Sequence, residues 1–458
     1  VQPVLTPAQM RHVDQNSGVD VDVLIGRAAY AVAHAARLLM DGTYGRRVVV
    51  VAGKGNNGAD GRLAAELLEQ RGCRVTVFDA ERTPIVLPAC DLVIDAAFGT
   101  GFRGEYSAPH TSVPVLAVDI PSGVDALTGD ECGRAMPADA TVTFGALKPG
   151  LVMQPGRGLA GEIHVVDIGL DIARAAEVDP RLLAVVDADD VVEWIPLRAS
   201  TAHKWNSGVR AIAGSRGMPG AARLACAAAY RAGAGIVHLS GIGLAADHEA
   251  PTEVVYRHLP NPGWVAPALA DVERFAAVLI GPGIGRGDEL VEDFIEFVVR
   301  CPRPLVIDGD GLQLLGASRD GKQGDAASVI ARRSASTILT PHDGEFSSLV
   351  GHEPGPDRIT EVREAAQHLG AVVLLKGSTT VVADPTGDVL LVDVGDERLA
   401  TAGSGDVLTG VVAAYLARGA RPLHAAAAGA FTHATALSFL PHDGVVASDL
   451  IAGLGHRD

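Results

Sequence analysis

Short, uninterrupted apolar runs recur along the chain and alternate with stretches of mixed polarity. The runs are rich in Val and Ile and do not alternate apolar with polar positions, as expected of parallel strands that are covered on both faces. This pattern predicts doubly wound α/β layers. In the N-terminal half the expected strands are 47–52, 74–79, 91–97, 113–120, 140–144 and 162–168.

Helix signals fall before and between these runs. Thr6 is followed by Pro7 and Gln9, which is the pattern of a capping box with Pro at the first helical position. Asp22 is expected to cap a second helix, which ends near Gly42. A third helix is expected over 59–71.

The rhythm of strands and helices breaks over 171–203 and then returns. Because 458 residues are too many for one ordinary core, we place a boundary near 185 and expect two domains, 1–185 and 186–458. The second half is expected to contain strands 209–213, 236–240, 277–281, 305–308, 337–340 and 372–376, a hairpin of 379–383 with 389–394, and Ala-rich helices over 221–231, 406–418 and 424–438.

Composition narrows the function classes. Hydrophobic residues make up 48% of the chain but aromatic residues only 4%, so the cores are built from Ala, Val and Leu. The net charge of −17 argues against a nucleic-acid binder, which needs a basic surface. No apolar run approaches the roughly 20 residues of a membrane span, and no secretory leader is visible. The five scattered cysteines lack disulfide or metal-ligand spacing, which favours a cytoplasmic location.

A glycine-rich segment, 53–61 (GKGNNGADG), directly follows the first buried strand. Backbone N–H groups at such a helix start suit an anionic ligand, and the Asn and Asp oxygens suit hydroxyl groups or a hard cation. The alternative is a tight strand-to-helix turn with Asn in the left-handed conformation. Two more loops, 95–101 (DAAFGTG) and 119–125 (DIPSGVD), also follow strands. All three are expected at the carboxyl edge of the sheet, where open α/β folds bind ligands.

This set of loops resembles the NAD(P)H-hydrate epimerase domain. The resemblance implies a potassium ion held by Asn57, Asp95 and Ser122. Asp119 is the candidate proton acceptor, because a carboxylate beside a cation stays ionised. Arg103 either pairs with a phosphate of the substrate or is a solvated loop charge. The substrate contacts implied are Asn56, Asn57, Gly58, Ala59, Asp60, Gly99, Thr100, Gly101, Phe102, Arg103, Gly104, Glu105 and Asp119.

A second glycine loop, 401–406 (TAGSGD), precedes a predicted helix late in the chain. Its backbone N–H groups, together with the helix dipole, form an anion hole. Asp406 at the helix start can accept a hydroxyl proton while the amides stabilise a phosphoryl group. The alternative is that Asp406 is a plain helix cap.

The segment AGSGD before a helix resembles the ribokinase-like fold. His203-Lys204 and the segments 281–285 (GPGIG), 340–345 (TPHDGE) and 376–380 (KGSTT) narrow the resemblance to the ADP/ATP-dependent NAD(P)H-hydrate dehydratase domain. His342 has an alternative as a solvent-facing loop residue, and Lys376 as a snorkelling edge lysine. The resemblance implies substrate contacts by Ala222, Gly285, His342 and Asp406. It implies adenine-nucleotide contacts by Lys376, Gly377, Ser378, Thr379, Thr380 and Gly405.

Two departures from the dehydratase pattern stand out. Asp343 replaces the usual Pro after the histidine and is expected to add negative charge near the site. The segment 308–312 (DGDGL) replaces the usual DADAL, and its two glycines are expected to loosen the turn. The roles of Asp308 and Asp310 therefore stay open.

The two resemblances cover nearly the whole chain. They imply a Rossmann-like doubly wound domain followed by a ribokinase-like α/β domain. They also imply an enzyme that interconverts R and S NAD(P)HX and dehydrates the S form with Mg²⁺ and ADP, or ATP, giving AMP and phosphate in the ADP reaction. The fold leads us to expect a homo-oligomer. The alternative is a small-molecule kinase of the ribokinase type fused to a non-catalytic nucleotide-binding module.

Overall fold

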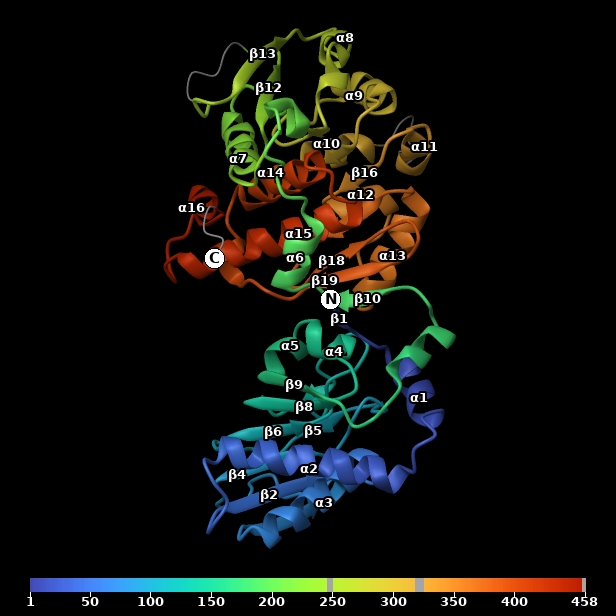
Figure 1. Cartoon of the computed structure of the whole chain (residues 1–458), viewed down its shortest axis with the longest axis vertical. Coiled ribbons are helices and arrows are strands. Elements are labelled where there is room, and N and C mark those ends of the chain that lie inside the picture. Colours follow the sequence, from blue (N-terminus) through green and yellow to red (C-terminus); the bar gives the residue numbers. More distant parts are fainter. Residues whose placement is uncertain (245–249, 318–324, 455–458) are drawn as a thin grey trace. The chain divides into compact units, whose positions relative to one another are not determined.

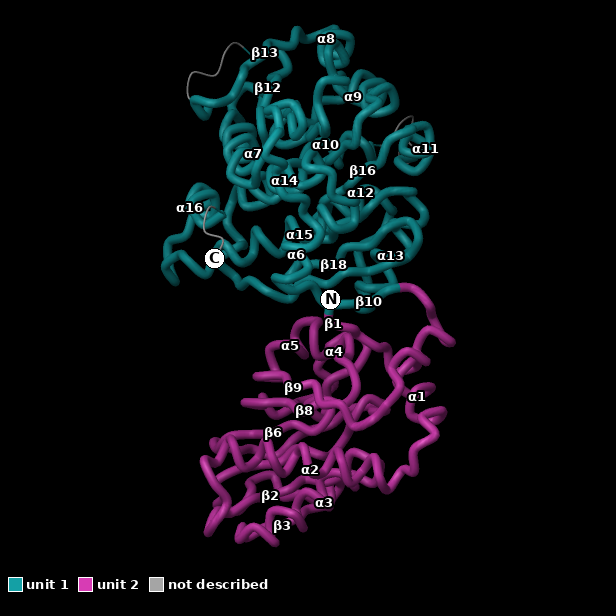
Figure 2. Tube along the Cα trace, viewed as in Figure 1, with its two compact units in different colours: residues 1, 182–458 teal, residues 2–181 magenta. Residues whose placement is uncertain are grey.

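The computed structural model describes residues 1–244, 250–317 and 325–454, and the chain divides into two compact units (Figure 2). One unit is Gln2–Arg181, and the other is Leu182–Asp458 together with Val1. The expected boundary near 185 lies at the end of strand β10 (Leu183–Val185). Because β10 pairs with β19 of the second unit, the observed division falls just before this strand.

The N-terminal unit is built on a parallel sheet of strand order β3-β2-β4-β6-β8-β9. Helices α2 and α3 pack on one face of it (Figure 1), and a smaller apolar cluster that includes Tyr106 and Met136 covers the other. The bounds are β1 Gln2–Pro3, α1 Pro7–Gln15, α2 Val21–Leu39, β2 Arg47–Ala52, α3 Asn56–Gln70, β3 Arg74–Asp79, β4 Leu92–Ala96, β5 Tyr106–Ser107, β6 Val115–Val118, β7 Gly133–Arg134, β8 Ala140–Phe144, α4 Pro149–Val152, α5 Gly156–Leu159 and β9 Glu162–Val166.

The helix starts of this unit differ in part from expectation. The capping box of α1 is confirmed: Oγ1 of Thr6 accepts from the Gln9 amide, and Oε1 of Gln9 accepts from the Thr6 amide. The cap of α2 is Asp20, whose carboxylate accepts from the amide of Asp22, so the expectation that Asp22 is the cap is wrong. Helix α3 begins at Asn56, earlier than expected, because Asn and Gly are weak helix formers that hid its first turn.

The second unit is built on a larger sheet, of strand order β10-β19-β18-β17-β16-β15-β14-β11-β12-β13. Its neighbours are parallel except for β18, which runs antiparallel to β17 and β19, so the predicted hairpin is confirmed. The remaining bounds are β11 Gly208–Ile212, β12 Ile236–Ile242, β13 Val255–Leu259, β14 Ala277–Ile280, β15 Leu305–Ile307, β16 Thr337–Leu339, β17 Val372–Leu375, β18 Thr380–Ala383 and β19 Val389–Val392.

Three Ala-rich helices, α7, α14 and α15, pack on one face of this sheet and form its main core cluster. Small side chains allow α14 to pack closely, and almost all of it is buried. The helices of the unit are α6 Ala188–Trp194, α7 Pro219–Arg231, α8 Val265–Leu269, α9 Asp288–Arg300, α10 Asp310–Leu315, α11 Ala326–Ala331, α12 Asp343–Val350, α13 Arg358–Leu369, α14 Ser404–Ala417, α15 Pro422–Thr435 and α16 Ala447–Gly453.

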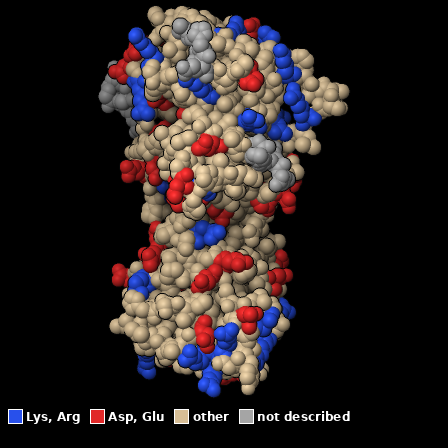
Figure 3. Space-filling model, turned by 90° about the vertical axis from the view of Figure 1, so that its left-hand side faces the viewer, with Lys and Arg blue, Asp and Glu red and all other residues tan. Residues whose placement is uncertain are grey.

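The surface carries both acidic and basic side chains, as the composition leads us to expect. On the face shown in Figure 3, basic side chains are interspersed with acidic ones. Within the described ranges no helix is both long and apolar enough to cross a membrane.

Candidate active sites

A cavity of about 780 Å³ in the N-terminal unit lies at the carboxyl ends of the central strands. The three loops singled out in the sequence meet there. A Cβ added at Gly99 would lie 3.0 Å from Oδ2 of Asp119 and 3.4 Å from Cγ of Asn57, so the three loops are in close contact there. The lining includes most of the predicted substrate contacts, namely Asn56, Asn57, Asp60, Gly99, Thr100, Gly101, Phe102, Arg103 and Asp119. The predicted contacts Gly58, Ala59, Gly104 and Glu105 lie outside this lining.

The residues expected to hold potassium belong to these three loops, and two of them, Asp95 and Ser122, are buried. Asp95 is fully buried, and its Oδ2 accepts from the amide of Ser122 at 2.9 Å. Burial raises the pKa of Asp95, and the hydrogen bonds from Ser122 oppose that rise. The side-chain amide atoms of Asn57 are buried, and neither has a hydrogen-bond partner among the described residues. An amide oxygen without a partner, a carboxylate and a hydroxyl are the types of ligand that fit a hard cation.

Asp119 is held in an uncommon conformation next to a buried lysine. Its backbone φ of 67° is in the left-handed region. Its Oδ1 accepts from Nζ of Lys148 at 2.7 Å and from Oγ1 of Thr143 at 3.2 Å, while Oδ2 accepts from the amide of Thr100 at 3.3 Å. Lys148 is 1% exposed and also donates to the carbonyl of Phe144. The proposed proton acceptor is therefore an ion-paired carboxylate of fixed orientation.

A second carboxyl group, that of Asp60, lines the same cavity. It is 7% exposed and has no hydrogen-bond partner among the described residues. Burial, with the nearby charges of Asp119 and Asp14, raises the pKa of Asp60 to about 8. Asp60 therefore carries its proton at neutral pH, so the cavity holds both a proton donor and a carboxylate acceptor.

Arg103 also lines the cavity, and its guanidinium donates a hydrogen bond to the carbonyl of its neighbour Phe102. Its side chain is in an exposed position, which leaves the guanidinium accessible to a ligand phosphate.

In the second unit, Asp406 lies in the first turn of α14, directly after the glycine loop. Gly403 precedes this helix with a φ of 88°, a conformation that favours glycine. Burial and the charge of Asp308 raise the pKa of Asp406 to about 7, against the opposing effect of Lys376. A carboxyl group that titrates near neutrality suits general-base catalysis.

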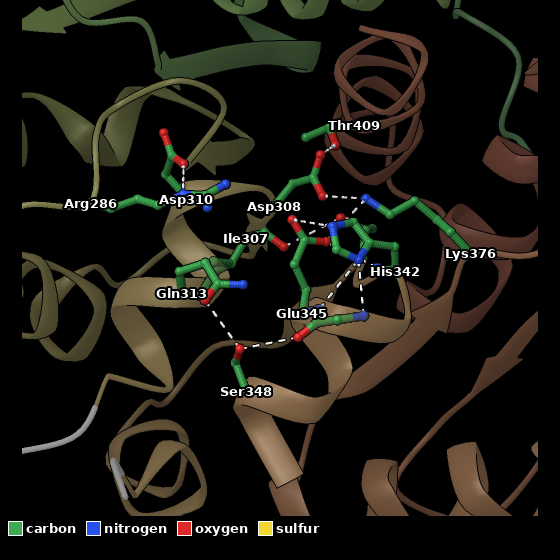
Figure 4. Close-up of polar contacts among 12 residues, drawn as sticks. Arg286, Ile307, Asp308, Asp310, Gln313, His342, Glu345, Ser348, Lys376 and Thr409 are labelled. Atoms are coloured by element: carbon green, nitrogen blue, oxygen red, sulfur yellow. Dashed lines mark hydrogen bonds and ion pairs between the residues drawn. The ribbon is translucent and has the colours of Figure 1, made fainter. Parts of the chain in front are cut away.

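Asp308, Glu345 and Lys376 form a network of charged groups (Figure 4). Nζ of Lys376 lies 2.9 Å from Oδ1 of Asp308 and 3.5 Å from Oε2 of Glu345. Oδ2 of Asp308 accepts from Oγ1 of Thr409 at 2.6 Å. Burial opposes the charge on Lys376, but Asp308 and Glu345 outweigh it and raise the pKa of Lys376. Because β17 is an interior strand and the ammonium faces carboxylates, Lys376 is not a snorkelling edge lysine.

The segment 308–312 forms a tight turn. Gly309 has a φ of 56°, and a Cβ added at Gly311 would lie 2.9 Å from Cα of Gly281. The expectation that these glycines loosen the turn is therefore wrong. Asp310 accepts from the amide of Gly285 at 3.0 Å and pairs with Arg286, so it anchors the GPGIG loop.

Asp343 does not leave an uncompensated charge beside the site. Its carboxylate pairs with the guanidinium of Arg358 at 2.7 and 3.0 Å, in an exposed position. The adjacent His342 caps α12, with Nδ1 accepting from the amides of Gly344 and Glu345. The His342 ring is 59% exposed, which leaves it accessible to a ligand.

The remaining predicted contacts of this unit are Gly405, residues 377–380 and Ala222. A Cβ added at Gly405 would lie 3.5 Å from Nζ of Lys376, so the glycine loop and the start of 376–380 are adjacent. Residues 377–379 connect β17 to β18, and Thr380 begins β18. Ala222 is buried in α7 within the core cluster.

Comparisons with known proteins place the chain in a family. A family model described as NAD(P)H-hydrate dehydratase matches residues 209–452, and one described as YjeF-related protein N-terminus matches 21–88 and 78–150. A Mycobacterium tuberculosis protein named bifunctional NAD(P)H-hydrate repair enzyme Nnr is 38% identical over 82% of this chain and 80% of its own length. Proteins of the same name from Mycobacterium leprae (36%, over 92% and 90%) and Escherichia coli (31%, over 94% and 87%) also match. The chain belongs to the family of bifunctional NAD(P)H-hydrate repair enzymes.

Among solved structures, the ADP/ATP-dependent NAD(P)H-hydrate dehydratase from Bacillus subtilis, co-crystallised with ATP/Mg²⁺, is 27% identical, with a TM-score of 0.49 over 59% of this chain and 95% of that one. The expected fold class of this repair-enzyme chain, a Rossmann-like domain followed by a ribokinase-like domain, is confirmed.

Sequence reasoning missed functional candidates in both units of this repair-enzyme chain. Lys148 follows a predicted strand by four residues, at the edge of the sheet where the glycine loops lie. That position is the sequence feature from which its place in the site could have been predicted. Asp14 lies on α1, outside any glycine motif, and no local signal pointed to it. Thr409 lies inside a helix predicted only from its alanines, so its bond to Asp308 became visible only in the structure.

Proposed function

We propose that this chain repairs hydrated NADH and NADPH with two active sites. The N-terminal unit interconverts R and S NAD(P)HX, and the second unit dehydrates the S form to NAD(P)H at the expense of ADP, or ATP in its place, giving AMP and phosphate with ADP. The observation that carries the proposal is the position of Asp406, a half-buried carboxyl group with a pKa of about 7 in the first turn of α14, in a chain of this family.

In the second unit, the dehydration proceeds through a phosphate ester. Hydrated NAD(P)H carries a hydroxyl group at C6 of its ring, and hydroxide is a poor leaving group. Asp406 accepts the hydroxyl proton while the amides of 402–405 stabilise the phosphoryl group, which passes from the nucleotide to the hydroxyl oxygen and releases AMP from ADP. Phosphate then leaves C6 as a proton is lost from the adjacent ring carbon, which restores the ring double bond of NAD(P)H. Mg²⁺ would neutralise charge on the nucleotide phosphates.

The substrate is proposed to contact Ala222, Gly285 and His342. The exposed His342 ring and the Gly285 loop, which Asp310 anchors, support this placement. The adenine nucleotide is proposed to bind the loop 376–380 and Gly405, and the contact between Lys376 and Gly405 supports it.

In the N-terminal unit, Asp119 is the proton acceptor. Asn57, Asp95 and Ser122 would hold a potassium ion, which would supply positive charge beside the ring and its phosphates. The orphaned amide of Asn57 supports this assignment. Asn56–Asp60, Gly99–Glu105 and Asp119 would bind the substrate, and the convergence of these loops on one cavity supports it.

We also propose a cytoplasmic location and a homo-oligomer. All five cysteines are free thiols, which supports a reducing compartment.

Product analysis tests the dehydratase assignment. Purified S-NADHX is incubated with the protein, Mg²⁺ and ADP, and the products are separated by chromatography. NADH, AMP and phosphate in equal amounts are expected. A stable phosphorylated product would instead identify a small-molecule kinase.

A further inference from the structure

Asp406 shares its surroundings with three other carboxyl groups and one ammonium group. Asp308 follows β15, Asp310 begins α10, Glu345 lies in α12, and Lys376 follows β17. All four charges act on the carboxyl group of Asp406. Of these groups, Asp308 and Lys376 are bonded directly to each other at 2.9 Å.

The Asp308–Lys376 pair is fixed against the helix that carries Asp406. Oγ1 of Thr409 donates to Oδ2 of Asp308 at 2.6 Å, and Thr409 lies three residues after Asp406, on the next turn of α14. A Cβ added at Gly405 would lie 3.5 Å from Nζ of Lys376 and 3.9 Å from Oδ2 of Asp308. The pair therefore lies close to Gly405, the residue that precedes Asp406.

We infer that Asp308 and Lys376 are a pair of positioning residues for Asp406, fixed to α14 by Thr409, whose opposite charges act together on its carboxyl group. The inference rests on the proposed role of Asp406 as the base of the dehydration.

The two members of the pair act in opposite directions. The Asp308 carboxylate repels the ionised form of Asp406, whereas the Lys376 ammonium stabilises it. Asp310 and Glu345 add to the repulsion. On the remaining side, His433 of α15 lies 3.4 Å from Oγ of Ser404, and burial lowers its pKa to about 4, so it carries no charge at neutral pH.

This arrangement gives Lys376 a role other than nucleotide binding alone. Its ammonium is already bonded to the buried carboxylate of Asp308 and faces the buried carboxylate of Glu345. Removing the ammonium leaves the carboxylates uncompensated, and removing the Asp308 charge leaves the ammonium free to stabilise ionised Asp406. The two substitutions should therefore move the titration of Asp406 in opposite directions.

The test is the pH dependence of kcat for the dehydration of S-NADHX by the full chain at saturating ADP. Asp308→Asn keeps an acceptor for Thr409 but removes the charge. We expect the acidic limb of the pH profile of kcat to move to lower pH by about one unit. Lys376→Met should move the limb up by about one unit. Lys376→Arg keeps the charge and should leave the limb near its wild-type position, even if Lys376→Met folds poorly.

Ser348→Ala is the matched control. Ser348 lies at the edge of the same network, where its hydroxyl donates to Gln313 and to the carbonyl of Gly344, and its loss removes no charge. Limbs that stay in place in both Asp308→Asn and Lys376→Met, or that move the same way, would overturn the inference. So would a Lys376→Met enzyme whose only defect is a raised KM for ADP. A wild-type chain that forms no NADH from S-NADHX would refute the proposed function instead.

Discussion

Nζ of Lys148 lies 2.7 Å from Oδ1 of Asp119, in a pair whose lysine is almost fully buried. The second unit contains a comparable pair, Lys376 with Asp308, at 2.9 Å. In each unit the lysine follows a strand at the carboxyl edge of the sheet, and its partner is an aspartate that follows another strand. The roles differ, because Asp119 itself lines the cavity whereas Asp308 lies beside the proposed base.

Substituting Lys148 should destabilise the N-terminal unit and abolish epimerisation. In Lys148→Met the half-buried Asp119 carboxylate loses its ion-pair partner, and the loss should lie between the under about 1 kcal/mol of an exposed pair and the about 3–5 kcal/mol of a fully buried one. Urea denaturation measures this loss. The control is Lys54→Met, which breaks the exposed Lys54–Glu81 pair of the same unit and should cost under about 1 kcal/mol. Equal losses in the two variants would show that the Lys148 pair is no stronger than a surface contact.

Asp60 should make the N-terminal unit less stable as the pH rises. Its pKa of about 8 in the folded chain lies above the ordinary value of 3.8, so the unfolded chain releases the proton first. This loss in the free energy of unfolding is absent below about pH 4, grows between pH 4 and pH 8, and is complete above about pH 8. Asp60→Asn removes it, so the variant should gain more stability over the wild type at pH 8 than at pH 5.

Denaturation at the two pH values measures this difference. The exposed carboxylate of Glu69, on the same helix, provides the control, and Glu69→Gln should change stability equally at both values. A gain from Asp60→Asn that is the same at pH 5 and pH 8 would contradict the assignment of a protonated Asp60.

Separate substitutions should remove the two activities independently. Asp406→Asn removes the proposed base and should lower the dehydration rate about 10²–10⁴-fold, with epimerisation unchanged. Asp119→Asn should do the reverse. Rates are measured on pure R-NADHX for epimerisation and on pure S-NADHX for dehydration. Full dehydratase activity in Asp406→Asn would remove Asp406 from its role.

Epimerisation should require a monovalent cation that binds through Asn57. Replacing K⁺ with tetramethylammonium at constant ionic strength should lower the epimerisation rate and leave the dehydration rate unchanged. Asn57→Ala should need more K⁺ for half-maximal activity, because it removes the unpartnered amide oxygen. A titration with KCl measures both effects, and a rate independent of K⁺ in the wild type would rule out the site.

The sequence predicted the strand framework well because parallel strands buried on both faces have a strong local signature. Ala140–Phe144 has the expected bounds, and most other strands differ by a few residues at their ends. Helix α9 was not predicted, although Leu290, Phe294, Phe297 and Val298 recur at helical spacing and share one buried face.

The glycine loops were also readable, because each directly follows a strand or precedes a helix. The charge pairs were not. Thr409 and Asp308 are 101 residues apart, and Lys148 and Asp119 are 29 residues apart, so only the tertiary fold brings them together. For the same reason the roles of Asp308 and Asp310 stayed open at the level of sequence, and the structure separates them: Asp308 holds Lys376, and Asp310 anchors the Gly285 loop.

The most direct test of the proposed repair function is the absorbance at 340 nm after the protein is added to a mixed R/S NADHX preparation with K⁺, Mg²⁺ and ADP. We expect NADH to form from both epimers, faster than they interconvert without enzyme. Recovery that stalls when the S form is consumed would contradict the role of the N-terminal unit. No recovery with ADP or with ATP would contradict the account as a whole.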